Sequence, residues 1–115
     1  MTNTLEKTVG LIPPVISRYY KVAFTGDGDS NIIDVAGASS VVIISNTVLT
    51  IKVPTIDTDG EFTTTEAAIV DSDLHKNPTA SKAGFIAGNV MPPALVLTNA
   101  SGGASTAYVY VTWTR

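Results

Sequence analysis

Residues 106–114, Thr-Ala-Tyr-Val-Tyr-Val-Thr-Trp-Thr, alternate strictly between two kinds of side chain and decide the fold class. The apolar members of the series are Ala107, Val109, Val111 and Trp113. Successive side chains of a β-strand point to opposite faces, so this period of two predicts a strand with one core face. The other face, which bears Tyr108 and Tyr110, is predicted to be a half-wet sheet surface or an interface.

Shorter segments before this strand carry strand patterns of their own. Residues 94–98 predict its hairpin partner across the Gly- and Ser-rich residues 99–104. Residues 41–44, Val-Val-Ile-Ile, form a continuous apolar run and predict a strand buried on both faces. Residues 47–53 alternate apolar and polar side chains up to the proline that is expected to end the strand. With Ser45-Asn46 between them, these two runs predict a tight hairpin in which Asn46 adopts a positive φ.

The remaining strands are marked by β-branched and aromatic residues between turn signals. They are predicted over residues 15–24, 32–35, 61–70 and 84–88. A short helix through residues 66–70 is the alternative for part of the third, and residues 71–82 are expected to be the longest loop. Seven to eight short strands without a convincing helix predict an all-β fold, an antiparallel β-sandwich or jelly-roll-like barrel.

The first residues predict an extended N-terminal arm, residues 1–14, before a single β-sandwich domain, residues 15–115. The arm is polar at first and then apolar at Val9, Leu11 and Ile12, and Pro13-Pro14 force an extended exit. Apolar side chains on an arm need a surface to lie on. That surface is either the protein's own sheet or a neighbouring subunit.

The composition argues against several classes of partner. The chain is 44% hydrophobic but only 15% charged, so much of its surface is expected to be neutral. A net charge of −3 gives no attraction to nucleic acid. There is no cysteine, no apolar run long enough to span a bilayer and no apolar segment typical of a signal peptide. We therefore expect a protein made in the cytoplasm, with no nucleic-acid or membrane partner.

Residues that carry chemistry are few, and no enzyme activity, metal or cofactor is predicted. His75 is the only histidine, and with Asp71 and Asp73 it offers one imidazole and two carboxylates on one polar loop, a pattern that is common by chance. Residues 27–31 match the start of a calcium loop but lack its later glycine and glutamate, so they are interpreted as a turn. No acid can be assigned to His75 as the partner that a Ser or Thr nucleophile requires.

Aromatic residues are the remaining candidates for recognition. They are Tyr19, Tyr20, Tyr108, Tyr110 and Trp113. Either they pack in the core and across strands, or some of them form a platform that stacks on a sugar ring or a partner side chain. Tyr108 and Tyr110 are expected to be exposed because they alternate with the apolar face.

Several features together resemble one class of protein. They are the polar start, the Pro13-Pro14 arm, the Thr-, Ala- and Gly-rich strands, the absence of cysteine and the aromatic strand Tyr108–Trp113. In overall character the chain resembles small accessory proteins of tailed-phage (bacteriophage) virions, the capsid decoration or cement proteins and similar head or tail components. The resemblance contains no diagnostic motif, and no functional residue is carried over from it.

The resemblance implies a structural protein of the virion that forms a homo-oligomer, with a trimer favoured. It would bind a major capsid protein or another virion protein and brace the lattice through protein–protein contacts. Partner or subunit contacts are expected at Val9, Leu11, Ile12, Tyr19, Tyr108 and Tyr110. The alternative is a carbohydrate-binding or adhesion module that uses the aromatic sheet face.

Overall fold

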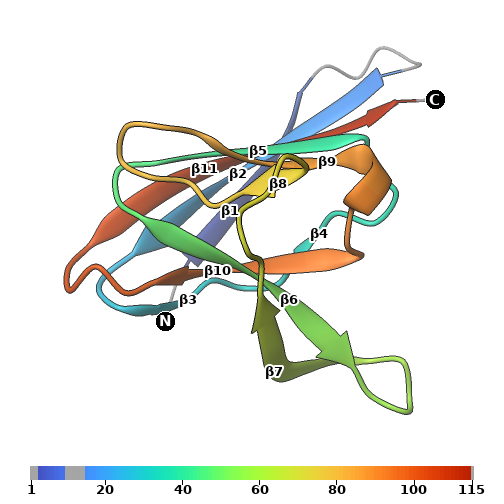
Figure 1. The fold of residues 1–115 in the computed structure, drawn as a ribbon, viewed down its shortest axis with the longest axis horizontal. Coiled ribbons are helices and arrows are strands. Elements are labelled where there is room, and N and C mark those ends of the chain that lie inside the picture. The colour runs from blue at the N-terminus through green and yellow to red at the C-terminus, as the bar shows by residue number, and fades with distance from the viewer. Residues whose placement is uncertain (1–2, 10–14, 115) are drawn as a thin grey trace.

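The computed structural model describes residues 3–9 and 15–114, which form two antiparallel β-sheets packed face to face (Figure 1). The larger sheet has six strands in the order β1-β2-β11-β5-β9-β8. Its strands are β1 (Asn3–Val9), β2 (Val15–Phe24), β5 (Ser40–Ser45), β8 (His75–Lys76), β9 (Gly84–Ala87) and β11 (Ser105–Thr114).

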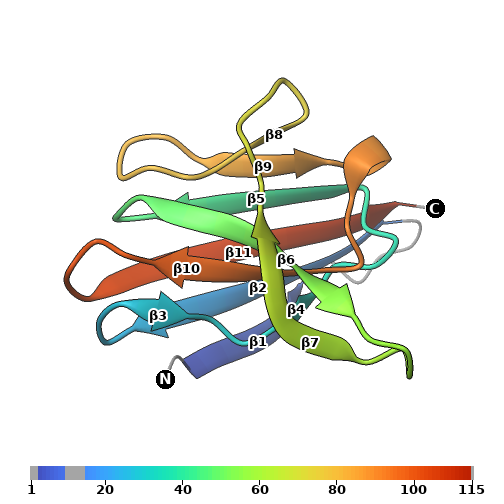
Figure 2. The same ribbon diagram turned by 60° about the horizontal axis from the view of Figure 1, so that its bottom comes forward.

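The smaller sheet has five strands, with β3, β10, β6 and β7 side by side and β4 paired to the other end of β10. Its strands are β3 (Gly28–Asp29), β4 (Ile33–Asp34), β6 (Leu49–Ile56), β7 (Phe62–Ala68) and β10 (Ala94–Asn99). Figure 2 shows β10 and β6 in front of the larger sheet. The predicted fold class is confirmed: the protein is an all-β, jelly-roll-like sandwich.

Helical structure in the described residues amounts to one 3-10 turn, Gly88–Val90. The helix considered over residues 66–70 is not formed, because β7 continues to Ala68. The described part of the chain accordingly contains no helix of the length and hydrophobicity that crossing a membrane requires. The predicted loop over residues 71–82 includes the two-residue strand β8, which pairs with β9 at the end of the larger sheet.

The core lies between the two sheets and is almost entirely aliphatic. Most strands contribute alternate side chains to it, as the period of two predicts, whereas residues 94–97 of β10 are buried on both faces of their strand. The largest fully buried side chains are Ile33, Ile43, Leu49, Ile51, Ile86, Leu95, Leu97, Val22, Val35, Val41, Val96 and Val109. Trp113 packs against the edge of this core, and its indole N–H donates to the Ala36 carbonyl at 2.8 Å.

Both predicted hairpins that involve the central strands are wrong in the same way. β5 and β6 follow one another in the chain but belong to different sheets, and so do β10 and β11. Each short connection therefore carries the chain across the core. Sequence periodicity does not distinguish the two arrangements, because either one places the same alternate residues inside.

Side chains at the corner between β5 and β6 explain why the chain leaves the sheet there. The carbonyl oxygen of the Asn46 side chain accepts the Thr106 backbone N–H at 2.9 Å, and Ser45 Oγ accepts the Thr47 N–H at 3.1 Å. A two-residue hairpin loop would need a positive φ, whereas no described residue other than glycine has one. The corner is thus held by side-chain hydrogen bonds to the backbone.

A second prediction for this region is also wrong. Residues 41–44 are buried on one face alone: Val41 and Ile43 are inaccessible, whereas Val42 and Ile44 are exposed on the outside of the larger sheet. No layer covers that outer surface in the described chain, so the apolar run reflects two different environments. The run is continuous because Val41 and Ile43 belong to the core, whereas Val42 and Ile44 belong to a second, exposed apolar surface.

The N-terminal residues that the structure describes belong to the protein's own sheet. Asn3–Val9 form β1, which pairs along its whole length with β2, the first of the two alternatives for the predicted arm. The side chain of Val9 is not described, and Leu11 and Ile12 lie outside the described residues. Their predicted contacts therefore remain predictions.

Pro54 does not end its strand, contrary to expectation. β6 continues through Pro54 to Ile56, with an irregular register at that point. The pairing of β6 with β10 stops at Lys52, so beyond it β6 pairs with β7 alone. Proline has no N–H to donate and is tolerated where one side of a strand is unpaired. The outer halves of β6 and β7 consequently form a hairpin that projects from the sandwich (Figure 1).

One glycine marks a close approach of two backbones and gives a test of this packing. A Cβ atom at Gly84 of β9 would lie 2.7 Å from the Lys76 carbonyl oxygen and equally close to Pro78. We predict that Gly84→Ala lowers the free energy of unfolding by about 1–3 kcal/mol, because the neighbouring backbone has to move. Urea denaturation followed by circular dichroism measures the change.

The matched control is Gly103→Ala, since a Cβ there meets no atom within 4 Å and the backbone has no positive φ. It should change the unfolding free energy by less than about 1 kcal/mol. Equal effects of the two substitutions would contradict the close packing of β9 against residues 76–78.

Candidate interaction surface

An exposed apolar surface covers the outside of the larger sheet. Strand register places Tyr19, Tyr110, Val42 and Phe85 side by side across β2, β11, β5 and β9. A second row joins Tyr108 of β11 to Ile44 of β5. We call the six residues Tyr19, Val42, Ile44, Phe85, Tyr108 and Tyr110 the outer face.

The outer face is accessible although its side chains are large. Val42, Ile44, Tyr108 and Tyr110 are between 37% and 48% exposed, and Tyr19 and Phe85 are half-buried. The rings of Tyr19 and Tyr110 lie 6.1 Å apart at 40°, within the usual range for aromatic pairs. The side chains of this surface therefore form cross-strand pairs, like those on the buried face of a sheet.

Charge on this surface is of one sign. Lys21 lies opposite Tyr108 on β2, and Lys76 lies opposite Phe85 on β8, and both lysines are exposed. On the described outward positions of β2, β5, β8, β9 and β11 there is no acidic residue. The outer face is thus an apolar area with cationic neighbours, on a protein whose net charge is negative.

The predicted aromatic residues separate into two groups. Tyr108 and Tyr110 are exposed as expected, and the half-buried Tyr19 lies beside Tyr110 on the same face. Tyr20, by contrast, is buried in the core and Trp113 lies on the inner side of β11. The five aromatic residues therefore do not form one platform.

Sequence reasoning missed Val42, Ile44 and Phe85 as surface residues. Val42 and Ile44 were expected to be buried, and nothing in the local sequence singled out Phe85. The alternation in β11 could have indicated them, because its outward tyrosines lie beside outward residues of the strand that pairs with it. The sequence does not show that β5 pairs with β11, so the outward positions of β5 could not be predicted from those of β11.

A shallow pocket of about 380 Å³ adjoins the Tyr108 end of the outer face, between Lys21, Ile44 and Ala80. A second hollow of about 420 Å³ lies at the Trp113 end of the sandwich. Arg18 lies over the Trp113 ring there, with its guanidinium carbon 5.8 Å from the ring centroid. Among the described residues that line these two hollows there is no histidine or acidic side chain.

In the loop that was considered as a metal site, the Asp71 side chain forms hydrogen bonds within the protein. Asp71 Oδ1 accepts the Asn77 backbone N–H at 2.8 Å and the Asn77 side-chain amide at 3.0 Å. The other side of Asn77 faces β6, because its Oδ1 accepts the Ile51 N–H at 2.6 Å. His75 is half-buried on β8, and its Nδ1 atom is buried without a hydrogen-bond partner. In the described residues, no three histidine, cysteine or acidic side chains gather into a metal site.

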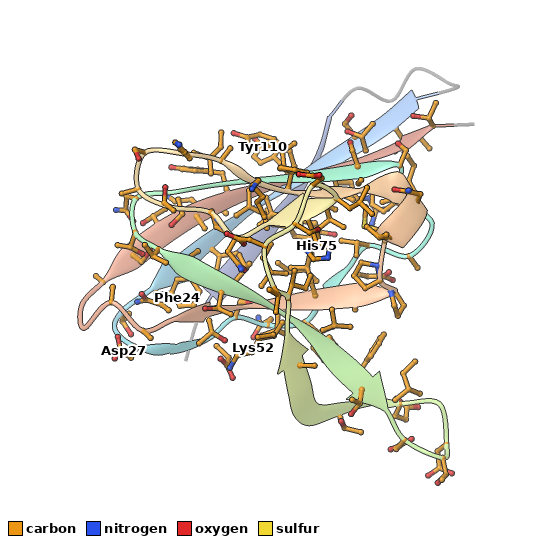
Figure 3. All side chains as sticks on the ribbon, in the orientation of Figure 1. Phe24, Asp27, Lys52, His75 and Tyr110 are labelled. Carbon is orange, nitrogen blue, oxygen red and sulfur yellow. The ribbon has the colours of Figure 1, made fainter. Side chains whose placement is uncertain are left out.

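In the segment that matches the start of a calcium loop, Asp27 and Asp29 likewise accept hydrogen bonds from other parts of the protein. Asp27 Oδ1 accepts the Gly102 N–H at 2.8 Å, which ties this turn to the loop before β11 (Figure 3). Asp29 Oδ1 accepts the Thr98 hydroxyl at 2.6 Å and lies 4.0 Å from Lys52 Nζ. The carboxylates of Asp27 and Asp29 thus have separate partners.

The hydrogen bonds at Asp71 predict a pH effect. The Asn77 backbone N–H, followed by its side chain and the charges of Lys76 and His75, holds the pKa of the Asp71 carboxyl below its ordinary value. A lowered pKa stabilises the folded protein above the unfolded-state pKa of about 3.9, and this contribution disappears as the pH falls through the folded-state value. Asp71→Asn should therefore be less stable than the unsubstituted protein at pH 7, with a smaller difference at pH 3.

Urea denaturation at both pH values measures this difference. A difference of the same size at pH 3 and pH 7 would show that the charge on Asp71 does not contribute.

Comparison with known proteins identifies the fold. No protein-family model matches the chain. No curated protein matches it either. Among solved structures, the chain is similar to a Cupin_2 domain of an XRE family transcriptional regulator from Enterobacter cloacae, with a TM-score of 0.52 and 12% identity. That match covers 97% of this chain and 98% of the other.

Two longer proteins share the same arrangement. Peruvianin-I, a cysteine peptidase from Thevetia peruviana latex, matches with a TM-score of 0.51 and 12% identity over 96% of this chain. Oxalate oxidase in complex with glycolate matches with a TM-score of 0.51 and 13% identity, also over 96%. The chain spans 60% of the first protein and 50% of the second. At these identities the likeness concerns the fold alone: the chain has a cupin-like fold, a half-barrel sandwich of two antiparallel sheets.

Proposed function

We propose that the chain is a non-enzymatic structural protein of a virus particle. It binds and stabilises a capsid or tail lattice of virion proteins, further copies of itself included, through protein–protein contacts. The outer face is the contact surface. The cupin-like fold itself carries no argument for this function, since its structural neighbours include enzymes and a regulator domain.

One observation carries the proposal: the larger sheet exposes two rows of large apolar side chains that no described element covers. Isolated apolar residues are common on protein surfaces, but contiguous ones mark interaction sites. Tyrosines are enriched at such sites because they bury a large area and lose little conformational entropy. The adjoining lysines give the surface a preferred orientation toward an acidic partner.

A sugar-binding role for the tyrosines finds less support. Sugar sites combine a stacking ring with several polar groups that converge on the hydroxyls. Here the neighbours of Tyr110 across the strands are Tyr19 and Val42. Tyr108 lies between Lys21 and Ile44, and in the adjoining pocket the side-chain oxygen of Asn46 already accepts the Thr106 N–H. Glycan-array binding that is lost in Tyr108→Ala and Tyr110→Ala would establish the carbohydrate-binding alternative.

The test is the copy number of the chain in purified particles. Particles from cells that carry the gene are purified on a density gradient, and mass spectrometry measures the ratio of this chain to the major capsid protein. We predict a constant ratio for the unsubstituted chain. Tyr110→Glu should lower it about tenfold or more, because a buried charge at the centre of an interface costs more than 1.4 kcal/mol.

The matched control is Val70→Glu, which places the same charge at a residue that is 80% exposed and outside the outer face. It should leave the ratio unchanged. Circular dichroism and thermal unfolding of both variants establish that each is folded. Absence of the chain from purified particles would reject the proposed function, and equal ratios for Tyr110→Glu and Val70→Glu would reject the outer face as its contact surface.

A further inference from the structure

The projecting end of the β6–β7 hairpin carries a second exposed apolar surface. Ile56 and Phe62 are directly paired in register and are 53% and 38% exposed. Beyond Lys52, β6 has no partner other than β7, and a two-stranded ribbon has little stability of its own in water. Its apolar pair therefore gains from contact with another surface.

The turn at the end of this hairpin is acidic and is held by hydrogen bonds. Asp57 Oδ1 accepts the N–H groups of Asp59 and Glu61 at 2.9 and 3.0 Å, and the Asp57 N–H donates to the Glu61 carbonyl at 2.9 Å. Gly60, with φ of 81°, completes the turn. Asp59 and Glu61 are exposed, and both lie in the turn that connects Ile56 to Phe62. We call the pair and these two acids the hairpin tip.

The hairpin tip and the outer face are complementary. One combines apolar side chains with Asp59 and Glu61, and the other combines them with Lys21 and Lys76. Opposite potentials favour encounter in one orientation, and the apolar parts provide the affinity. A turn already held by hydrogen bonds loses little entropy when it docks.

The two surfaces cannot meet within one molecule. The hairpin belongs to the smaller sheet and projects from it, whereas the outer face lies on the far side of the larger sheet. Figure 3 shows Tyr110 and the projecting hairpin at opposite sides of the molecule. Any contact between them is therefore a contact between two copies.

We propose that the hairpin tip of one copy docks on the outer face of a second copy. The inference rests on the proposed function, since it names the occupant of the same surface. The contact is heterologous: each copy offers its hairpin to one neighbour and its outer face to another. Such contacts generate a ring if the rotation closes and a filament if it does not.

The first experiment measures self-association by sedimentation velocity over a series of concentrations. Unsubstituted protein should exceed the monomer mass of 12.0 kDa as the concentration rises. The face variant Tyr110→Glu and the tip variant Ile56→Ser/Phe62→Ser should each associate about tenfold or more weakly. Val70→Ser removes an exposed apolar side chain that lies outside both the outer face and the hairpin tip. This control variant should associate like the unsubstituted protein.

The second experiment mixes the two defective variants. The face variant retains an intact tip, and the tip variant retains an intact outer face. A heterologous contact therefore predicts that the mixture forms one-to-one pairs and nothing larger, although neither variant associates alone. Face-to-face pairing of two copies predicts no such recovery.

These results separate the inference from the proposed function. Protein that stays monomeric at every concentration, or a mixture without pairs, would overturn the docking of the tip. The copy number of the tip variant in purified particles then decides the rest: incorporation at the unsubstituted ratio would leave the proposed function standing with a different occupant on the outer face. Absence of both the tip variant and the unsubstituted chain from particles would reject the proposed function while the self-association result stands.

Discussion

β11 pairs with β2 along ten residues on one side and with β5 along six on the other, and the rest of the sandwich is arranged around it. Its inward residues Ala107, Val109 and Val111 are fully buried. Because successive side chains of a strand point in opposite directions, burying these three fixes Tyr108 and Tyr110 on the outside. Because β2 and β5 pair in register with β11, their inward and outward residues are fixed in the same way. One constraint thus creates both the core and the outer face.

The sequence predicted much of the fold because alternation is local. The inner and outer residues of β11 and the extents of β2 and β7 follow from patterns within each segment. The pairing of β5 with β11 could not be predicted, since it depends on residues 62 to 72 positions apart. The connections after Ser45 and Asn99 could not be predicted either, because a corner and a hairpin place the same residues inside.

The candidate surface was predicted in part for the same reason. Tyr108 and Tyr110 lie in the segment whose alternation was clearest, whereas Val42 and Ile44 lie in a continuous apolar run that resembles a buried strand. A run of four apolar residues is compatible with two buried faces or with one buried and one interacting face. Only the architecture distinguishes them, and here no element of residues 3–9 or 15–114 lies above the second face.

The position of β11 in the chain also bears on how the protein folds. It follows the other ten described strands, yet its partner β2 lies more than 80 residues earlier. During synthesis, β2 and β5 therefore emerge from the ribosome long before the strand that joins them. Domains dominated by such distant pairings fold slowly and expose unpaired strands in the meantime. Until β11 has emerged, β2 and β5 thus lack the strand that pairs with both of them, and aggregation competes with folding over this interval.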